Sequence, residues 1–204
     1  DSTLVRGTQE TVGWNKEGDS WSYRYPDGSL CRGRWESIEG QWYYFNIEGI
    51  MQTGWQLLDN QYFYLYPNGQ MAVGWAEMDG KWYYFCTGEE AGETAGSMQG
   101  AGWRVIGPYY YYFNEDGSMY TGWLKQNGKQ YYLNTVDNSL KGALFTGCIK
   151  RDGKTYFADS NGEIAEGWCQ IDGNWYYFYP ESGELAYNTV INGFHVNQDG
   201  IWER

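Results

Sequence analysis

The sequence is poor in the residues on which most enzymes and nucleic-acid-binding proteins rely. Its 204 residues include a single histidine, His195, and only 14 lysines and arginines against 26 aspartates and glutamates. One histidine is too few for a His-based catalytic triad or a zinc site, and His195 is interpreted as an ordinary strand residue. At a formal charge of −12, the chain has no basic footprint for nucleic acid and is repelled by anionic lipid. We therefore expect no enzyme activity and no nucleic-acid partner.

Long hydrophobic runs and cofactor motifs are also missing. No apolar stretch reaches the roughly 18 residues that a membrane span needs, so no membrane insertion is expected. The N-terminal segment DSTLVRGTQETVGW has no apolar core of the kind found in signal peptides. No glycine-rich phosphate loop follows a strand pattern, and most acidic residues fall in predicted turns rather than at calcium-loop spacing. We expect no catalytic residue, no cofactor and no metal.

Four cysteines, Cys31, Cys86, Cys148 and Cys169, lack the CxxC spacing of metal sites. An extracellular location would permit disulfides between them. Cys148, however, stands where other copies of a repeat have tryptophan, which favours small apolar substitutions and free thiols.

What the chain has in abundance is aromatic residues, 20% of the sequence, together with 29 glycines. Such a composition argues against disorder. The aromatics recur in a unit of about 20 residues that begins with tryptophan, taken here as position zero. Eight units begin at Trp14, Trp35, Trp55, Trp75, Trp103, Trp123, Cys148 and Trp168.

Each unit is predicted to be a β-hairpin. Asp-Gly or Asn-Gly at positions four and five, between aromatic runs such as WYYF, is a strong hairpin signal. No segment has a helical period, and one hairpin buries too little surface to be stable alone. The prediction is an all-β solenoid of stacked hairpins. A lead-in covers 1–11, the repeats cover 12–187 with insertions near 86–101 and 134–146, and a degenerate capping half-repeat covers 188–204.

Strand alternation sorts the rings onto two faces of each hairpin. With the turn at positions four and five, position zero lies opposite nine and position two opposite seven, so zero, seven and nine share a face. Positions eight and ten point to the other face and are interpreted as core. Position 16 is apolar throughout and is also interpreted as packing: Leu30, Met51, Met71, Met98, Met119, Leu140, Ile164 and Leu185.

The rings at positions zero, seven and nine are the candidate ligand-binding residues. Tryptophan is unfavourable in a core unless its indole N–H finds a partner, and it is the best cation–π partner, so its recurrence here favours a ligand role. Gln130 replaces the ring at position seven of the unit from Trp123, and Cys148 and Thr155 replace two rings in the next, so sites there are expected to be missing or altered. The complete triplets are Trp14/Trp21/Tyr23, Trp35/Trp42/Tyr44, Trp55/Tyr62/Tyr64, Trp75/Trp82/Tyr84, Trp103/Tyr110/Tyr112 and Trp168/Trp175/Tyr177, with Trp123 as a further candidate.

From Val12 onward, motifs such as GKWYYFC, GNWYYFY and GPYYYYFNEDGSMYTG, with Gly-Trp pairs such as Gly54-Trp55, resemble the choline-binding, or cell-wall-binding, repeat family of Gram-positive surface proteins. The resemblance implies a left-handed superhelix of hairpins with choline sites between successive hairpins. It also implies an extracellular, cell-wall-associated protein whose partner is a choline-bearing, teichoic-acid-like polymer. Similar repeats in clostridial toxins and glucan-binding enzymes bind carbohydrate, so a glucan or glycan ligand is the alternative.

A quaternary ammonium suits an aromatic box because it donates no ordinary hydrogen bond and is held by ring quadrupoles and methyl contacts. Three rings would give about −4 kcal/mol, a roughly millimolar site. Several sites on one repeated polymer would add avidity of about 10²–10⁴. A purely structural spacer is a third hypothesis, and an uncapped solenoid end is a candidate surface for self-association.

Overall fold

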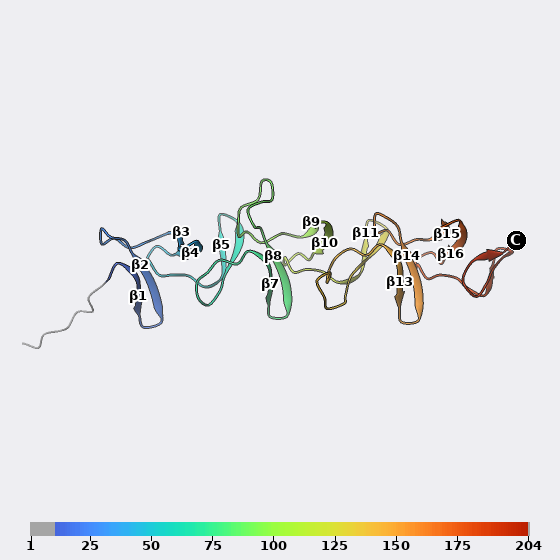
Figure 1. Cartoon of the computed structure of the whole chain (residues 1–204), viewed down its shortest axis with the longest axis horizontal. Coiled ribbons are helices and arrows are strands. Elements are labelled where there is room, and N and C mark those ends of the chain that lie inside the picture. The colour runs from blue at the N-terminus through green and yellow to red at the C-terminus, as the bar shows by residue number, and fades with distance from the viewer. Residues whose placement is uncertain (1–10, 204) are drawn as a thin grey trace, which may run out of the picture. The chain divides into compact units, whose positions relative to one another are not determined.

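The structure, a computed structural model, describes residues 11–203 (Figure 1). This part of the chain consists of strands and turns, as the all-β prediction requires. Across residues 11–203, no helix has the length and apolar character needed to cross a membrane. The predicted lead-in lies outside the described residues except for its last position.

Eight antiparallel hairpins, each of two five-residue strands, start where the repeat predicts. They are β1 (Gly13–Glu17) with β2 (Ser20–Arg24), β3 (Arg34–Ile38) with β4 (Gln41–Phe45), β5 (Gly54–Leu58) with β6 (Gln61–Leu65), β7 (Gly74–Met78) with β8 (Lys81–Phe85), β9 (Gly102–Ile106) with β10 (Tyr109–Phe113), β11 (Gly122–Gln126) with β12 (Lys129–Leu133), β13 (Gly147–Arg151) with β14 (Lys154–Ala158), and β15 (Gly167–Ile171) with β16 (Asn174–Phe178). A three-stranded sheet of β17 (Thr189–Ile191), β18 (Phe194–Val196) and β19 (Trp202–Glu203) follows.

The chain divides into two compact units, one with β1–β8 up to Gln99 and one with β9–β19 from Gly100. The handedness of the solenoid stays a prediction.

The register within each hairpin is the predicted one. In the second hairpin, Trp35 pairs with Tyr44, and Ser37 pairs with Trp42. The turn explains this register: Glu39 and Gly40 both have positive φ, 52° and 79°, which is the requirement of the two-residue type I′ turn. The register therefore places positions zero, seven and nine on one face.

From the second hairpin onward, the opposite face forms the core. Tyr43 at position eight is 9% exposed and Phe45 at position ten is fully buried. The position-ten residues Leu65, Phe85, Phe113, Leu133 and Phe178 are buried in the same way. The prediction that positions eight and ten are core is confirmed from the second hairpin onward. In the first hairpin these positions are the half-buried Ser22 and Arg24.

Successive hairpins are joined by ring contacts and by backbone hydrogen bonds. The Trp14 indole meets Tyr43 of the next hairpin at a centroid distance of 4.9 Å, nearly edge-on. Met51 N–H donates to the Trp21 carbonyl at 2.7 Å, and Met71 N–H donates to the Trp42 carbonyl at 2.9 Å. Position 16 of one unit is thereby fixed beside position seven of the unit before it.

The insertion in the unit from Trp123 displaces position 16. Leu144, not Leu140, forms the β-bridge to Leu133, and its N–H donates to the Tyr110 carbonyl at 2.8 Å. The assignment of Leu140 was wrong because the inserted residues lie before the bridge rather than after it. Leu140 is instead 37% exposed.

The last sheet, β17–β19, is a shortened hairpin closed by a third strand. Val190 pairs with His195, so they occupy positions zero and nine, and the Asn192-Gly193 turn follows too early for a position seven to exist. His195 is a strand residue, as expected, and its Nδ1 lies 3.1 Å from a Glu203 carboxylate oxygen. Without its own pair of rings, this sheet offers no further box. All four cysteines are free thiols, as expected.

Candidate ligand-binding boxes

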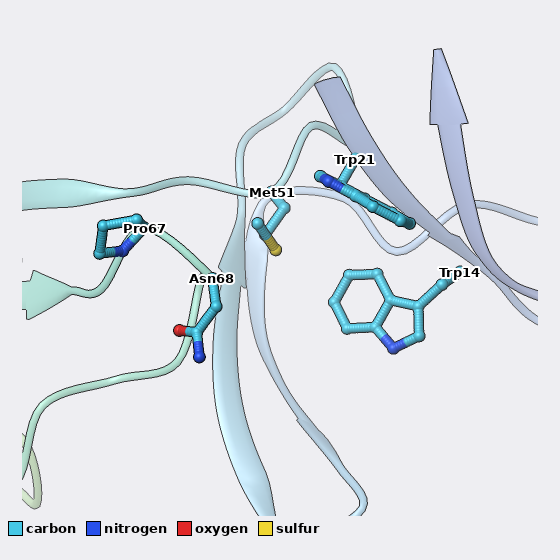
Figure 2. Close-up of a pocket in the computed structure, with 5 residues that line it drawn as sticks. All are labelled: Trp14, Trp21, Met51, Pro67 and Asn68. Carbon is cyan, nitrogen blue, oxygen red and sulfur yellow. The ribbon is translucent and has the colours of Figure 1, made fainter. Parts of the chain in front are cut away.

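The first box lies on the outer face of β1 and β2 (Figure 2). The indoles of Trp14 and Trp21 stand at 88° to each other with centroids 6.2 Å apart. A cavity of about 360 Å³ is lined by these rings together with Met51, Pro67 and Asn68. Its walls come from three successive repeats. The first repeat supplies two rings, the second supplies a thioether and the third supplies a turn.

The methionine wall is held in place by the turn of the third unit. Gly69 has φ +84°, and a Cβ there would lie 2.2 Å from the Met51 sulfur. Only glycine satisfies both the turn and this close approach. The same glycine places Asn68, its neighbour, at the rim of the box.

Tyr23, the third ring of the predicted triplet, is not among the residues that line this cavity. Its ring contacts Trp14 at 5.4 Å and Tyr25 at 5.9 Å, both nearly perpendicular. Position nine therefore braces the position-zero indole from the side. The same edge-on contact joins Trp55 to Tyr64 and Trp103 to Tyr112.

A second box lies near the C-terminal end of the compact unit that begins at Gly100. Trp168, Trp175, Phe194 and Trp202 line a cavity of about 280 Å³. Trp168 meets Phe194 at 5.9 Å and 83°, and Phe194 meets Trp202 at 6.1 Å and 76°. All four walls are aromatic, so this box has more ring surface than the first.

The two boxes follow one plan. Asn197 N–H donates to the Ile201 carbonyl, just as Asn46 N–H donates to the Ile50 carbonyl, so Trp202 occupies the place of Met51. Phe194 likewise occupies the position-eight place from which Tyr43 contacts Trp14. Position 16 is therefore a box wall at these two places, whereas the sequence favoured packing alone.

The remaining predicted residues lie on the same outer faces. Trp42 is 46% exposed, Trp55 40%, Tyr62 49% and Tyr110 54%, which leaves ring surface open to a ligand. Trp35, Tyr44, Tyr64, Trp75, Trp82, Trp103, Tyr112 and Tyr177 are partly buried. Tyr84 is 7% exposed, because the insertion after β8 covers it.

That insertion covers Tyr84 with a carboxylate. The Tyr84 hydroxyl donates to Glu90 at 2.8 Å, and the backbone N–H groups of Thr87 and Gly88 donate to the same carboxylate at 2.8 and 3.0 Å. Burial and the adjacent Glu90 raise the pKa of Tyr84 to about 12. Burial opposes ionisation of Glu90, but these hydrogen bonds outweigh it and lower its pKa to about 2. Tyr84 is thus committed to holding the insertion.

In the repeat from Trp123, which lacks a ring at position seven, a side-chain hydrogen bond lies where the first box has an open face. The Gln130 side chain donates to the Glu181 carbonyl, where the first box has Asn68, and so bridges the place of a ligand. Trp123, still 38% exposed, has Tyr132 and Tyr156 at 4.8 and 4.6 Å. The expectation of missing or altered sites in the units from Trp123 and Cys148 stays a prediction.

One cation already lies against the first box. The Lys16 ammonium is 5.6 Å from the Trp21 ring centroid, opposite it in the register. At the C-terminal box the corresponding partner of Trp175 is the uncharged Gln170. Within residues 11–203, no group of three or more metal-ligating side chains converges. The fold and the aromatic cavities together define a module of repeated β-hairpins.

The choline-binding repeat model matches residues 31–73, 52–91, 101–140 and 145–189, and a cell wall binding repeat model matches 12–30. These matches cover well over half of the chain. The chain belongs to the choline-binding repeat family. No curated protein sequence is significantly similar to it.

Solved structures of the same family resemble the chain. Choline-binding protein F from Streptococcus pneumoniae is 32% identical, with a TM-score of 0.73 over 90% of this chain and 61% of that protein. The same protein in the presence of a peptidoglycan analogue is 31% identical, with a TM-score of 0.55 over 95% and 58%. The choline-binding domain of CbpL from Streptococcus pneumoniae is 25% identical, with a TM-score of 0.65 over 96% and 98%. The chain thus spans less than two thirds of choline-binding protein F.

Proposed function

We propose that the chain binds choline-type quaternary ammonium groups, without catalysis, in aromatic boxes built from positions zero and seven of one unit and position 16 of the next. The observation that carries this is the composition of the two cavities. Rings line all of one, and rings with a thioether line most of the other. A trimethylated nitrogen needs such walls, whereas a sugar needs hydrogen-bonding partners for its hydroxyls.

The first box supports a weak individual site. Two indoles and a polarizable methionine give about 0.5–1 kcal/mol per exposed ring and up to about 2 when desolvated. Millimolar affinity follows after immobilisation of the ligand. Recurrence of Trp-bearing faces along the chain suits a polymer with repeated choline groups, because linked weak sites gain avidity.

We assign the chain to the cell-wall surface, where it would attach a secreted protein to a choline-bearing, teichoic-acid-like polymer. Family membership supports cell-wall binding, and the charge of −12 favours a cationic ligand over long range. The alternative of carbohydrate binding is favoured only at the groove lined by Cys148 and Thr155.

Calorimetric titration and thermal melting test the proposal. Choline and tetramethylammonium should raise the melting temperature, while sodium chloride at equal ionic strength should not, because only the former bind the folded boxes. The double variant Trp21→Ala/Trp175→Ala removes one wall of each box and should lose the corresponding sites. The double variant Ser37→Ala/Ser182→Ala, away from both cavities, should titrate like the parent. An unchanged titration of the tryptophan variant would refute the proposal.

A further inference from the structure

The repeat that begins at Cys148, which lacks two of the rings, lines a groove. The groove is about 630 Å³, more than twice the volume of the C-terminal box, and is within the usual range of ligand sites, roughly 300–1,000 Å³. Cys148 and Thr155 line it where the boxes have tryptophan. Its occupant cannot be held by the ring pair used elsewhere.

The plan of a box is otherwise retained at this groove. Leu185 N–H donates to the Thr155 carbonyl at 2.8 Å, as Met51 N–H does to Trp21. Gln198 and Asp199 occupy the turn positions that Pro67 and Asn68 have at the first box. The backbone arrangement of a box is therefore kept at this groove, while the replaced side chains change the chemistry of its walls.

Polar side chains have replaced the lost aromatic walls. Lys150, Asp172, Gln198 and Asp199 line the groove, and none of these side chains makes a hydrogen bond or ion pair with another residue in the 11–203 range. Tyr187, 55% exposed, adds an open ring and a hydroxyl. Lys150 repels a quaternary ammonium, and the two aspartates repel a phosphate.

From this combination we infer that the groove binds a neutral, hydroxylated ligand, a saccharide unit of a wall glycan. Carboxylate and amide oxygens accept from sugar hydroxyls, the ammonium and amide N–H groups donate to them, and the apolar face of a pyranose stacks on a tyrosine ring. The chain would then carry two ligand classes side by side: choline-type groups in the boxes and a glycan in this groove. The saccharide assignment stands on this groove's own geometry and does not depend on the boxes.

The thiol inside the groove gives a local test. Cys148 is exposed, whereas Cys31 and Cys86 are buried and Cys169 is half-buried. Labelling of the folded chain with iodoacetamide, followed by mass spectrometry of each cysteine peptide, would be run with maltoheptaose, isomaltoheptaose, chitotetraose or choline. At least one oligosaccharide should slow labelling of Cys148 severalfold and leave Cys169 unchanged, and choline should not protect Cys148. Protection by choline alone, or by none of the four, would overturn the inference.

Variants separate the groove from the choline boxes. Lys150→Ala and Asp199→Asn should reduce the oligosaccharide protection of Cys148, while Lys125→Ala, the same repeat position in the preceding unit, should not. All three variants should keep the choline titration of the parent, since none of these residues lines a box. Equal protection in all three would contradict a role for the polar lining.

Discussion

The indole rings of Trp14 and Trp21 face each other as the two walls of a right-angled corner, 88° apart with centroids 6.2 Å apart. They come from adjacent strands, β1 and β2, and Met51 of the next unit closes the third side. Because the methionine is fixed through the backbone of Trp21, the three-sided box is complete only when two units are stacked. Ligand binding and stacking of hairpins should therefore be thermodynamically coupled.

Removing one wall of the corner should abolish the site without unfolding the chain. Trp21 is 38% exposed, so Trp21→Ala is expected to cost less stability than a buried aromatic, for which about 3–5 kcal/mol is typical. Calorimetry should show one fewer choline site and unchanged affinity at the C-terminal box. Phe45→Ala, at a fully buried position, is the contrasting variant and should lower the melting temperature strongly. Full choline stoichiometry in Trp21→Ala would contradict the assignment of the first box.

The Lys16 ammonium should weaken the first box, because it lies over the same ring that the ligand would use. Lys16→Gln reproduces the uncharged residue found opposite Trp175 and removes both the competing cation and its repulsion. We expect about two- to fivefold tighter choline binding, the equivalent of roughly 0.5–1 kcal/mol for one exposed cation–π contact. Binding at this site alone is measured by an NMR titration that follows the methyl resonance of Met51, one of the five methionines in the chain.

Lys125→Gln is the matched control for that charge change. Lys125 pairs with Gln130 rather than with a ring, so its removal should leave the Met51 titration unchanged. Equal tightening in both variants would mean that net charge, not the contact with Trp21, governs affinity.

Gly69 should control the position of Met51. In Gly69→Ala the new Cβ would meet the flexible end of the Met51 side chain, which should swing out of the box and weaken choline binding there. Gly80→Ala introduces a side chain at a similar φ, +75°, but with no atom within 4 Å. Both variants should lose about 1–2 kcal/mol of stability from the left-handed backbone, yet only Gly69→Ala should lose affinity. Equal affinities in the two variants would contradict a role for Met51 as a wall.

Acid should loosen the insertion after β8. Glu90 has a pKa of about 2 in the folded chain against an ordinary value of 4.5, so its stabilising effect is present above pH 4.5 and is lost as the pH falls toward 2. Amide exchange at Thr87 and Gly88, corrected for intrinsic rates, should accelerate over this range. Glu90→Gln should remove most of that pH dependence, whereas Glu93→Gln, an exposed neighbour, should retain it. A pH-independent parent would contradict the role of the carboxylate.

How much of this was predictable depends on whether a feature lies within one unit or between units. Strand alternation and the turn at Glu39 and Gly40 predicted the pairing of Trp35 with Tyr44 and the burial of Phe45, because both are local to one hairpin. The Met51 and Asn68 walls were missed because the contacts between units depend on the stacking, which a strand period does not encode. A cue existed: methionine recurs at position 16, and glycine follows in the second turn of the next unit.

The degenerate end was harder still. Trp202 lies in a half-repeat with shortened strands, so its equivalence to Met51 is visible only in the structure. There Trp202 pairs with Val196 as Met51 pairs with Phe45, and Asn197 N–H donates to the Ile201 carbonyl. The role of Leu144 at position 16 was missed for a related reason. An insertion inside the repeat changes the residue number at which position 16 falls, but the β-bridge to Leu133 is kept. Insertions and caps change the number of residues between equivalent positions, but the same backbone pairings recur in each repeat.

The frame of the seventh unit should accept a box if its rings are restored. The double variant Cys148→Trp/Thr155→Trp returns indoles to positions zero and seven, and the hydrogen bond from Leu185 N–H to the position-seven carbonyl is already in place. We expect one additional choline site by calorimetry and loss of oligosaccharide binding in the groove. The latter is measured by saturation-transfer NMR, because the variant has no thiol at position 148 to label. Each single variant should gain no site, since one ring alone gives too little cation–π energy for measurable binding. A double variant that melts like the parent but gains no choline site would show that two rings at these positions do not suffice.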